Sequence, residues 1–301
     1  MSVVASAPGK LVLSGEYAVL FGAPAVCMAV QRRAFATVTD SPDGACHVTT
    51  PGYEGADACA VIDAVCEGVR PANTIELDTR AFSAGGNKFG LGSSAALTVA
   101  LAAAMGNDTD VFATALRAHS LLQHGAGSGI DVAAAVHGGL LEYEMSSRSV
   151  HKLQWPRGLA MRVLWTGVSV STAAQLDKLA SQTVQPSRTA LALASSRMAS
   201  AWRSGDGDRI LADCVPYIGA LRQFSVDHDL GIFDAGHDEL TDAAMANDLV
   251  YKPAGAGGGD IGVLLGRDTK DLDAFVAQQA DLIKGVVPCD LDPAGVRLEP
   301  V

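Results

Sequence analysis

The sequence predicts an α+β fold, because its strand-like and helical segments do not alternate strictly as they do in a doubly wound parallel sheet. Residues 2–40 alternate apolar stretches with short turns, which predicts several short strands joined by tight connections at Gly9, Gly22 and Pro24. Helical spacing of apolar residues then predicts four helices, at about 57–69, 94–105, 109–124 and 129–137.

The C-terminal half continues this mixed pattern. It begins with a strand-like segment at 161–167, and a glycine-rich stretch at 253–260 later leads into another strand. The polar stretch just before the first of these segments predicts a domain boundary, so we expect an N-terminal domain of residues 1–160 and a C-terminal domain of residues 161–301. Further helices are expected at about 171–182, 186–203, 207–222 and 238–247.

Composition narrows the class of protein. The 301 residues are 49% hydrophobic and 18% charged, which is typical of a compact globular chain. The formal net charge of −11 argues against a nucleic acid or an anionic membrane as partner, because either would favour a basic surface. The N-terminus lacks the layout of a signal peptide, so we expect a cytoplasmic protein. Six scattered cysteines indicate neither a zinc site nor a disulfide framework.

One segment combines glycines, serines and a strong helix former. Residues 88–105 read KFGLGSSAALTVALAAAM, which predicts a helix that starts at the serines, with Ser93 or Ser94 as its N-cap. The start of a helix exposes unpaired N–H groups, and Gly90 and Gly92 let a ligand approach the backbone closely. The segment therefore predicts an anion-binding loop. The alternative is an ordinary glycine turn with a serine cap, and the spacing matches neither G-x-x-x-x-G-K-[ST] nor G-x-G-x-x-G.

Four motifs together settle the choice. They are APGKLVLSGEYAVL at 7–20, GLGSSAA at 90–96, HGAGSGIDVAAAVHGG at 124–139 and GAGGGD at 255–260. This set, in this order, resembles the GHMP kinase family. The resemblance implies an N-terminal domain like domain 2 of ribosomal protein S5 and a ferredoxin-like C-terminal domain. It also implies ATP and Mg²⁺ as cofactors.

The resemblance assigns roles to individual residues. Lys10 and Asp131 match the catalytic lysine and aspartate, and a nearby ammonium would keep the carboxylate ionised. For Asp131 alone, a helix cap would be the ordinary explanation. Ser94 is the expected metal ligand. The residues expected to bind the nucleotide are Lys88, Gly90, Leu91, Gly92, Ser93, Ser94, Ala95, Gly255, Gly257 and Gly258.

Within the family, the chain is most similar to the phosphomevalonate kinases. The reasons are the ending G-G-G-D of the third glycine motif, Lys88 before G-L-G-S-S, the pair Ala118 and His119, and the segment WTGVSVST at 165–172. The implied acceptor is 5-phosphomevalonate, and the implied state is a monomer or homodimer. The residues expected near the acceptor are Glu16, Tyr17, His119, Ser128, Gly129, Ser171, Lys252, Gly259 and Asp260, with His137 as a further candidate cation.

Two alternatives stay open. A mevalonate kinase would share the fold and nucleotide but phosphorylate a hydroxyl, and a non-catalytic relative would bind ligands without turnover. Magnesium is a point of difference, because Ser120 occupies the position of a magnesium-binding glutamate of mevalonate kinases. A carboxylate from Asp131, Glu16 or Asp260 is then a candidate ligand beside ATP oxygens and water.

Overall fold

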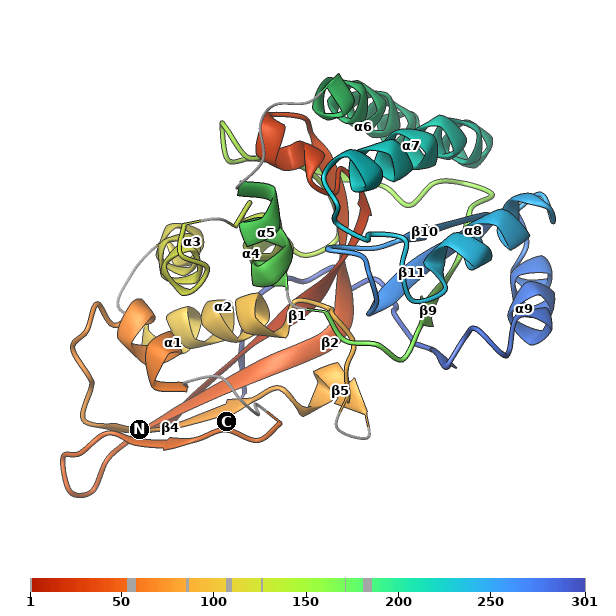
Figure 1. Ribbon diagram of the computed structural model, residues 1–301. Coiled ribbons are helices and arrows are strands. Elements are labelled where there is room, and N and C mark those ends of the chain that lie inside the picture. The colour runs from red at the N-terminus through yellow and green to blue at the C-terminus, as the bar shows by residue number, and fades with distance from the viewer. Residues whose placement is uncertain are drawn as a thin grey trace. The chain divides into compact units, whose positions relative to one another are not determined.

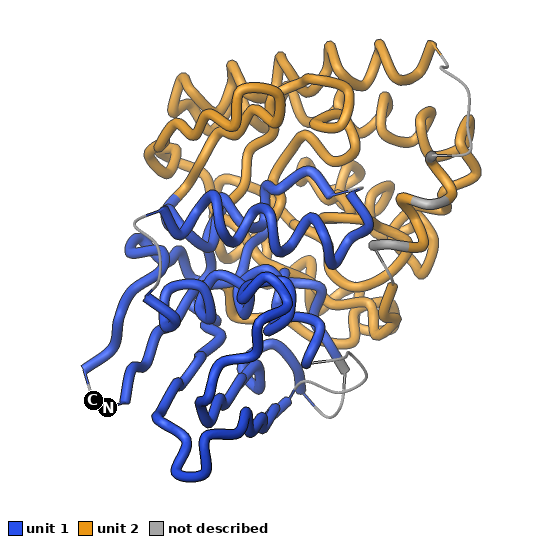
Figure 2. The backbone as a smooth tube through the Cα atoms, turned by 90° about the vertical axis from the view of Figure 1, so that its left-hand side faces the viewer, with its two compact units in different colours: residues 1–11, 28–139, 290–301 blue, residues 12–27, 140–289 orange. Residues whose placement is uncertain are grey.

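The computed structural model describes residues 2–52, 58–84, 87–106, 110–125, 127–170, 172–180 and 186–300. The chain forms two compact units (Figure 2). Unit 1 contains Met1–Leu11, Met28–Gly139 and Asp290–Val301, and unit 2 contains Val12–Cys27 and Leu140–Cys289. The units are discontinuous, because the long first two strands contribute residues to both and the C-terminal segment returns to unit 1. The contiguous domains 1–160 and 161–301 stay a prediction.

Unit 1 combines a sheet with a group of helices. Its strands follow the order β13-β1-β2-β4-β3, with β13 antiparallel to β1, β2 antiparallel to β4, and β3 parallel to β4. The elements are β1 (Ser2–Ser14), β2 (Ala25–Asp40), β3 (His47–Thr49), α1 (Ala58–Val65), β4 (Asn73–Asp78), η2 (Arg80–Phe82), β5 (Ser83–Ala84), β6 (Asn87–Lys88), α2 (Ser93–Met105), α3 (Val111–Leu122), α4 (Ile130–His137) and β13 (Arg297–Glu299).

Helix α2 is the centre of the helical group (Figure 1). It packs against α1, α3 and α4. Its residues are buried on every face, since the run from Ala95 to Ala102 is buried throughout. A helix that is apolar all round belongs in a core. The alanine-rich sequence therefore allows three neighbouring helices to approach α2 closely.

The expectation of several short N-terminal strands is wrong. β1 runs without interruption through Pro8 and Gly9, and β2 is a single strand of 16 residues. Gly9 serves a close approach of two segments: a Cβ atom there would lie 2.5 Å from the Phe82 ring and 2.6 Å from the Leu91 carbonyl oxygen. Gly22 does mark a turn, because it ends the short helix η1 (Ala18–Phe21) with a φ of 85°.

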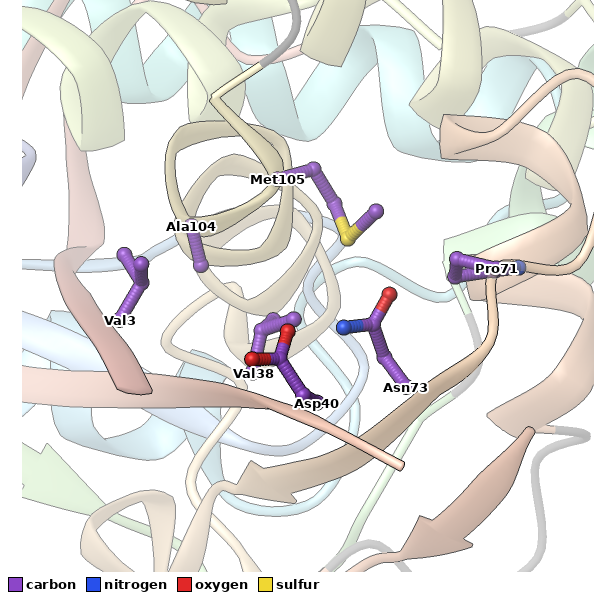
Figure 3. A pocket seen from close by; sticks show the side chains of 7 residues that line it. All are labelled: Val3, Val38, Asp40, Pro71, Asn73, Ala104 and Met105. Carbon is purple, nitrogen blue, oxygen red and sulfur yellow. The ribbon is translucent and has the colours of Figure 1, made fainter. Parts of the chain in front are cut away.

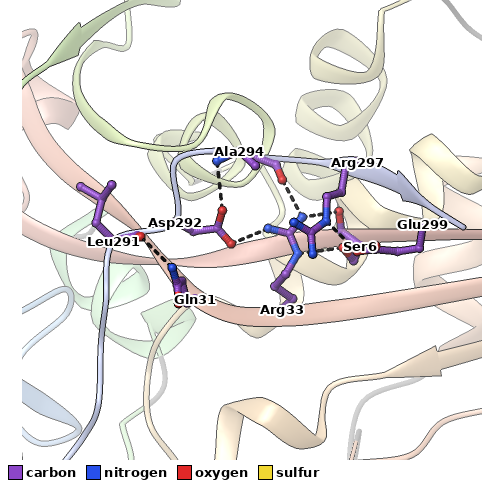
Figure 4. Close-up of polar contacts among 9 residues, drawn as sticks. Ser6, Gln31, Arg33, Leu291, Asp292, Ala294, Arg297 and Glu299 are labelled. Carbon is purple, nitrogen blue, oxygen red and sulfur yellow. Dashed lines mark hydrogen bonds and ion pairs between the residues drawn. The ribbon is translucent and has the colours of Figure 1, made fainter.

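A buried arginine fastens the C-terminal segment to the sheet of unit 1 (Figure 4). Arg33 on β2 pairs with Asp292 at 2.5 Å, and its guanidinium also donates to the Ser6 hydroxyl and to the Gly295 carbonyl. Gly295 and Gly138 touch, since a Cβ atom on Gly138 would lie 2.1 Å from the Gly295 nitrogen. The C-terminal segment is thus held beside the last turn of α4.

Unit 2 contains a second sheet with helices packed on it. Its strands follow the order β10-β11-β9-β12, and α8 and α9 pack on this sheet. Leu164, Leu240, Leu264 and Phe275 form part of the shared core. The elements are η1, β7 (Leu140–Glu144), β8 (Ser149–Leu153), β9 (Ala160–Trp165), α5 (Thr172–Ala180), α6 (Pro186–Ser204), α7 (Gly207–Asp227), α8 (His237–Met245), β10 (Val250–Pro253), β11 (Ile261–Gly266), α9 (Thr269–Gln278) and β12 (Gly285–Val286).

The helices predicted from the sequence lie close to their expected positions. α2, α4, α6 and α8 each begin within two residues of the predicted start. None of the helices in the described part of the chain is long and apolar enough to cross a membrane.

Candidate functional site

The first and second motifs meet in unit 1. The Lys10 N–H donates to the Leu91 carbonyl at 2.8 Å, and the absence of a side chain at Gly9 permits this approach. β1 therefore delivers Lys10 to the loop in front of α2. Its side chain runs past that loop, because a Cβ atom on Gly92 would lie 3.0 Å from Lys10 Cγ and 3.3 Å from Cε.

The start of α2 differs from the expectation in one respect. The N-cap is Gly92, with a left-handed φ of 76°, and no side chain in the described part of the chain caps the helix. Ser93 and Ser94 are the first two helical residues instead, so the prediction of a serine N-cap is wrong. The left-handed turn, which glycine adopts without strain, explains the difference. Both hydroxyls are consequently released from capping, and the first-turn N–H groups lack intrahelical acceptors.

Asp131 lies beside this loop. It is in the first turn of α4, and its Cβ is 3.7 Å from the position that a Cβ atom would take on Gly92. Its Oδ1 accepts from the Val132 N–H at 3.1 Å. This carboxylate therefore lies at the positive end of the α4 dipole. Lys10 and Asp131, which are 121 positions apart in the chain, thus meet at the same glycine.

His119 forms the next layer behind Asp131. Its Nδ1 is 3.9 Å from Asp131 Oδ1, and its side chain is only 2% exposed, whereas that of Asp131 is 17% exposed. Helix α3 presents His119 from the side of the carboxylate that is turned away from solvent. The sequence predicted both residues, and the structure brings them together.

The turn before α4 has the same left-handed glycine N-cap as the turn before α2. Gly129 is the N-cap with a φ of 79°, and the Ser128 hydroxyl accepts from the Ile130 N–H at 3.4 Å. Two helices in unit 1 therefore begin at left-handed glycines, and each first turn carries a predicted site residue.

Lys88 is an exposed residue in the short hairpin of β5 and β6, opposite Ser83.

Two of the predicted acceptor residues of unit 2, Glu16 and Lys252, belong to a buried network. Lys252 on β10 is 0% exposed, and its ammonium pairs with the Glu16 carboxylate and donates to the Pro253 carbonyl at 2.7 Å. Tyr217 on α7 donates to the same carboxylate and accepts from the Gly15 N–H at 2.9 Å. Neither charge faces solvent, so a substrate could touch Glu16 or Lys252 only if this pair opened.

Tyr217 was not predicted from the sequence. Burial and the neighbouring charge of Glu16 raise the pKa of its hydroxyl, which therefore remains protonated and serves as the donor. A lone tyrosine inside a helix next to Pro216 carries no sequence signal for this role.

Tyr17 and the third glycine motif are also connected. The Tyr17 hydroxyl donates to the Ala256 carbonyl at 2.6 Å, so its polar atom is occupied by the loop. Gly255, Gly257 and Gly258 all have positive φ values, between 70° and 79°. Such a run of left-handed backbone is typical of loops that point N–H groups toward an anion.

Gly259 and Asp260 close this loop. Asp260 has a φ of 53°, its N–H donates to the Val168 carbonyl at 2.5 Å, and its Oδ1 accepts from the Val170 N–H at 3.4 Å. The segment noted in the sequence at 165–172 therefore lies against Asp260. Ser171 lies outside the described residues.

His137 ends α4, where its ring packs edge-on against Phe112.

Known kinases are similar to this chain along much of its length. No protein-family model matches the sequence. A phosphomevalonate kinase of a Streptomyces species is 30% identical and covers 97% of each chain. The chain belongs to the GHMP kinase family. A mevalonate kinase of Methanothermobacter thermautotrophicus is 36% identical, but the similarity covers 51% of this chain and 54% of that one.

Solved structures confirm the GHMP kinase fold. The Streptococcus pneumoniae phosphomevalonate kinase in complex with phosphomevalonate and AMPPNP aligns with a TM-score of 0.80. The alignment covers 96% of this chain and 99% of that one at 20% sequence identity. The α+β fold class predicted from the sequence is thereby confirmed.

A hollow of about 370 Å³ in this GHMP kinase lies away from the four sequence motifs (Figure 3). It is lined by Ala104 and Met105 at the C-terminal end of α2 and by Asp40 and Asn73 at the ends of β2 and β4. Ser93 and Ser94 lie at the opposite end of the same helix. None of the predicted site residues that the structure describes lines this hollow, so it is not a candidate for the ATP site.

Proposed function

We propose that this GHMP kinase transfers the γ-phosphoryl group of ATP to the phosphate of 5-phosphomevalonate, which yields 5-diphosphomevalonate and ADP. An acceptor phosphate oxygen attacks the γ-phosphorus, and the bond from that phosphorus to the β–γ bridging oxygen breaks. Similarity to the Streptomyces phosphomevalonate kinase along nearly the whole chain supports this proposal. The structural observation that carries it is the meeting of Lys10, Gly92 and Asp131 at the starts of two helices.

The start of α2 fits the phosphates of ATP. Gly90 and Gly92 have φ values of 72° and 76°, so the backbone there carries no side chain that would keep an anion away. The first-turn N–H groups and the helix dipole attract negative charge. Lys10 adds a full positive charge beside the same glycine, where it would offset the charge that develops during transfer.

The residues near α2 also fit a magnesium ion held mainly by ATP. In the described part of the chain, no group of three His, Cys, Asp or Glu side chains is arranged to hold a metal ion. Mg²⁺ commonly keeps several waters and takes only one or two protein ligands beside substrate phosphates. Ser94 and Asp131 would supply those ligands. The ion would neutralise phosphate charge when bound.

The acceptor chemistry assigns a limited task to Asp131. A phosphomonoester has a second pKa near 6 and is largely dianionic at neutral pH, so it needs no base to become a nucleophile. Cations matter more, because two anions must be brought together. Lys10 and Lys88 are the proposed cations, His119 supports Asp131, and Ser128 with Gly129 shapes the adjoining turn. A cytoplasmic location and a monomeric or homodimeric state remain predictions.

An acceptor panel tests the proposal. A coupled ADP assay compares phosphomevalonate, mevalonate, homoserine and galactose as acceptors. We expect turnover with phosphomevalonate. Turnover with mevalonate alone would assign the chain to the hydroxyl-phosphorylating branch instead. Binding of ATP without turnover of any acceptor would mean that the protein kept the fold and lost catalysis.

A further inference from the structure

The third glycine-rich loop, residues 254–260, is fastened by side chains at two of its carbonyl groups. The Tyr17 hydroxyl donates to the Ala256 carbonyl at 2.6 Å. His237, the first residue of α8, has its Nε2 at 2.8 Å from the Gly259 carbonyl oxygen. The other ring nitrogen, Nδ1, is 2.8 Å from the hydroxyl of Tyr251 on β10. Nothing in the family motifs pointed to His237 or Tyr251.

The direction of these hydrogen bonds follows from the acceptor. A carbonyl oxygen can only accept, so His237 Nε2 must carry a hydrogen. Nδ1 of the neutral ring is then an acceptor, and Tyr251 donates to it. Complete burial lowers the pKa of His237 to about 4, so the ring is neutral at physiological pH. The chain of donors therefore runs from Tyr251 through His237 to Gly259.

The surrounding packing is built for this chain of contacts. Gly262 on β11 leaves room for the tyrosine, because a Cβ atom there would lie 2.2 Å from the Tyr251 hydroxyl oxygen. His237 and Tyr251 are both 0% exposed, and their rings stack with centroids 5.8 Å apart. Thr241 fixes the first turn of α8 by donating to the His237 carbonyl at 2.7 Å.

The two fastened carbonyls have a consequence for anion binding. A backbone loop attracts an anion only when its N–H groups face the ligand and its carbonyl oxygens point elsewhere. In the part of the chain that the structure describes, no partner is found for the N–H groups of Ala256 and Gly257. The carbonyls of Ala256 and Gly259 are both turned toward buried donors. Two N–H groups of the loop thus lack a partner among the described residues, whereas the carbonyls of Ala256 and Gly259 are both occupied.

We propose that His237 is a positioning residue, which, oriented by Tyr251, holds the Gly259 carbonyl away from a phosphate group bound by the loop 254–260. The proposal rests on the proposed function in one respect: the ligand of the loop is a phosphate of one of the two reactants. Tyr17 performs the same task at Ala256 from the other side of the loop. His237 contacts no reactant itself and acts only through Gly259.

Two substitutions at this position separate the hydrogen bond from packing. His237→Gln places an amide N–H near the position of Nε2 and can still donate to Gly259. His237→Asn places its amide near the position of Nδ1, so it keeps the contact with Tyr251 and loses the one with Gly259. Thr241→Val serves as the matched control, because it removes a buried hydrogen bond of α8 without touching the loop.

The variants are compared by hydrogen exchange of the peptide covering 254–260 and by the KM values for ATP and 5-phosphomevalonate. In His237→Asn we expect exchange of this peptide to accelerate and one KM to rise about tenfold, as the loss of one buried hydrogen bond implies. In His237→Gln and Thr241→Val both readouts should stay within about twofold of the wild type, even where thermal stability falls.

Each other outcome contradicts a specific part of the proposal. Unchanged exchange in His237→Asn, or equal impairment in His237→Gln, would overturn the positioning role. Faster exchange with both KM values unchanged would show that the loop does not bind a phosphate, and would also overturn it. If the wild type turns over no acceptor, the proposed function fails separately. Calorimetry with AMPPNP and with 5-phosphomevalonate then replaces the KM values, and a roughly tenfold weaker affinity in His237→Asn would still support the positioning role.

Discussion

The backbone N–H of Lys10 donates to the carbonyl of Leu91 at 2.8 Å, which joins the first family motif to the glycine loop before α2. This bond fixes where the lysine side chain begins, and contact with Gly92 determines where it runs. A charge that must act on a phosphoryl group gains from such fixed placement, because no reorganisation is needed at the moment of transfer. The proposed chemistry of unit 1 depends on this junction.

Gly92→Ala should impair nucleotide use more than it impairs folding. The residue has a φ of 76°, and a new Cβ would lie 3.0 Å from Lys10 Cγ, so both the turn and the lysine must shift. We expect kcat/KM for ATP to fall at least tenfold, with a loss of unfolding free energy of about 1–2 kcal/mol. Steady-state kinetics and urea unfolding measure the two effects.

Gly106→Ala is the matched control for that substitution. Gly106 caps the other end of α2 with a φ of 62°, but a Cβ atom there meets no atom of the described residues within 4 Å. It should therefore show a similar loss of stability with unchanged kcat/KM. Equal kinetic damage from both substitutions would attribute the effect to α2 stability and contradict the role of the Gly92 contact.

Asp131→Asn should distinguish the two acceptor classes. If the acceptor is a phosphate dianion, loss of the carboxylate removes an orienting group and we expect kcat to fall by about 10–100-fold. If a hydroxyl must be deprotonated, activity should become undetectable. Single-turnover phosphoryl transfer with each acceptor measures the difference, and circular dichroism checks that α4 stays folded.

The buried pair of Glu16 and Lys252 should be important for stability. Glu16→Gln leaves an ammonium that is 0% exposed without its counter-charge, which should cost about 3–5 kcal/mol of unfolding free energy. The double variant Glu16→Gln with Lys252→Met removes both charges and should recover much of that loss. Denaturant unfolding measures both.

A solvent-exposed ion pair serves as the control for the buried pair of Glu16 and Lys252. Arg267 and Asp208 form an ion pair whose side chains are 63% and 70% exposed. Arg267→Ala should change the unfolding free energy by no more than about 1 kcal/mol. If Glu16→Gln were equally mild, the carboxylate would have to be neutral or hydrated in the folded protein, contrary to the observed network.

The unfolding free energy should fall in mild acid, because His237 binds a proton more readily in the unfolded chain than in the folded one. Its pKa is lowered from 6.5 to about 4 by burial first and by the charge of Lys252, while the Gly259 carbonyl and Asp234 act in the opposite direction. At a pH between 6.5 and about 4, His237 binds a proton in the unfolded chain but not in the folded chain. The unfolding free energy therefore falls as the pH drops from about 6.5 toward 4, by on the order of 3 kcal/mol from this group.

Comparison with the His237→Gln variant separates the effect of His237 on the pH dependence of the unfolding free energy from the effect of the carboxylates. Glutamine does not titrate, so the difference in unfolding free energy between the variant and the wild type should shrink steadily between pH 7 and pH 4.5. A difference that is constant with pH would mean that folding does not lower the pKa of His237, and would contradict this prediction. Urea unfolding at several pH values provides the measurement.

The sequence by itself determined the class of the fold and predicted which residues of unit 1 carry the chemistry. Helix propensity located α2 and α4, and the order of the motifs identified the family. Local signals were less reliable at the boundaries: Gly9 predicted a tight connection, although β1 passes straight through it. Gly9 is required there by a close approach of Phe82 and Leu91, which no local pattern reveals.

Only the tertiary structure decided which polar side chains face a ligand and which are used internally. Lys252 and Glu16 suggested substrate contacts, yet folding buries them together. No sequence motif includes His237, yet it donates a hydrogen bond to the glycine loop. The physical reason is that a buried polar group must find a partner, and that partner is often far away in the chain. Propensity and motif spacing describe neighbours in sequence, whereas these pairings arise from packing.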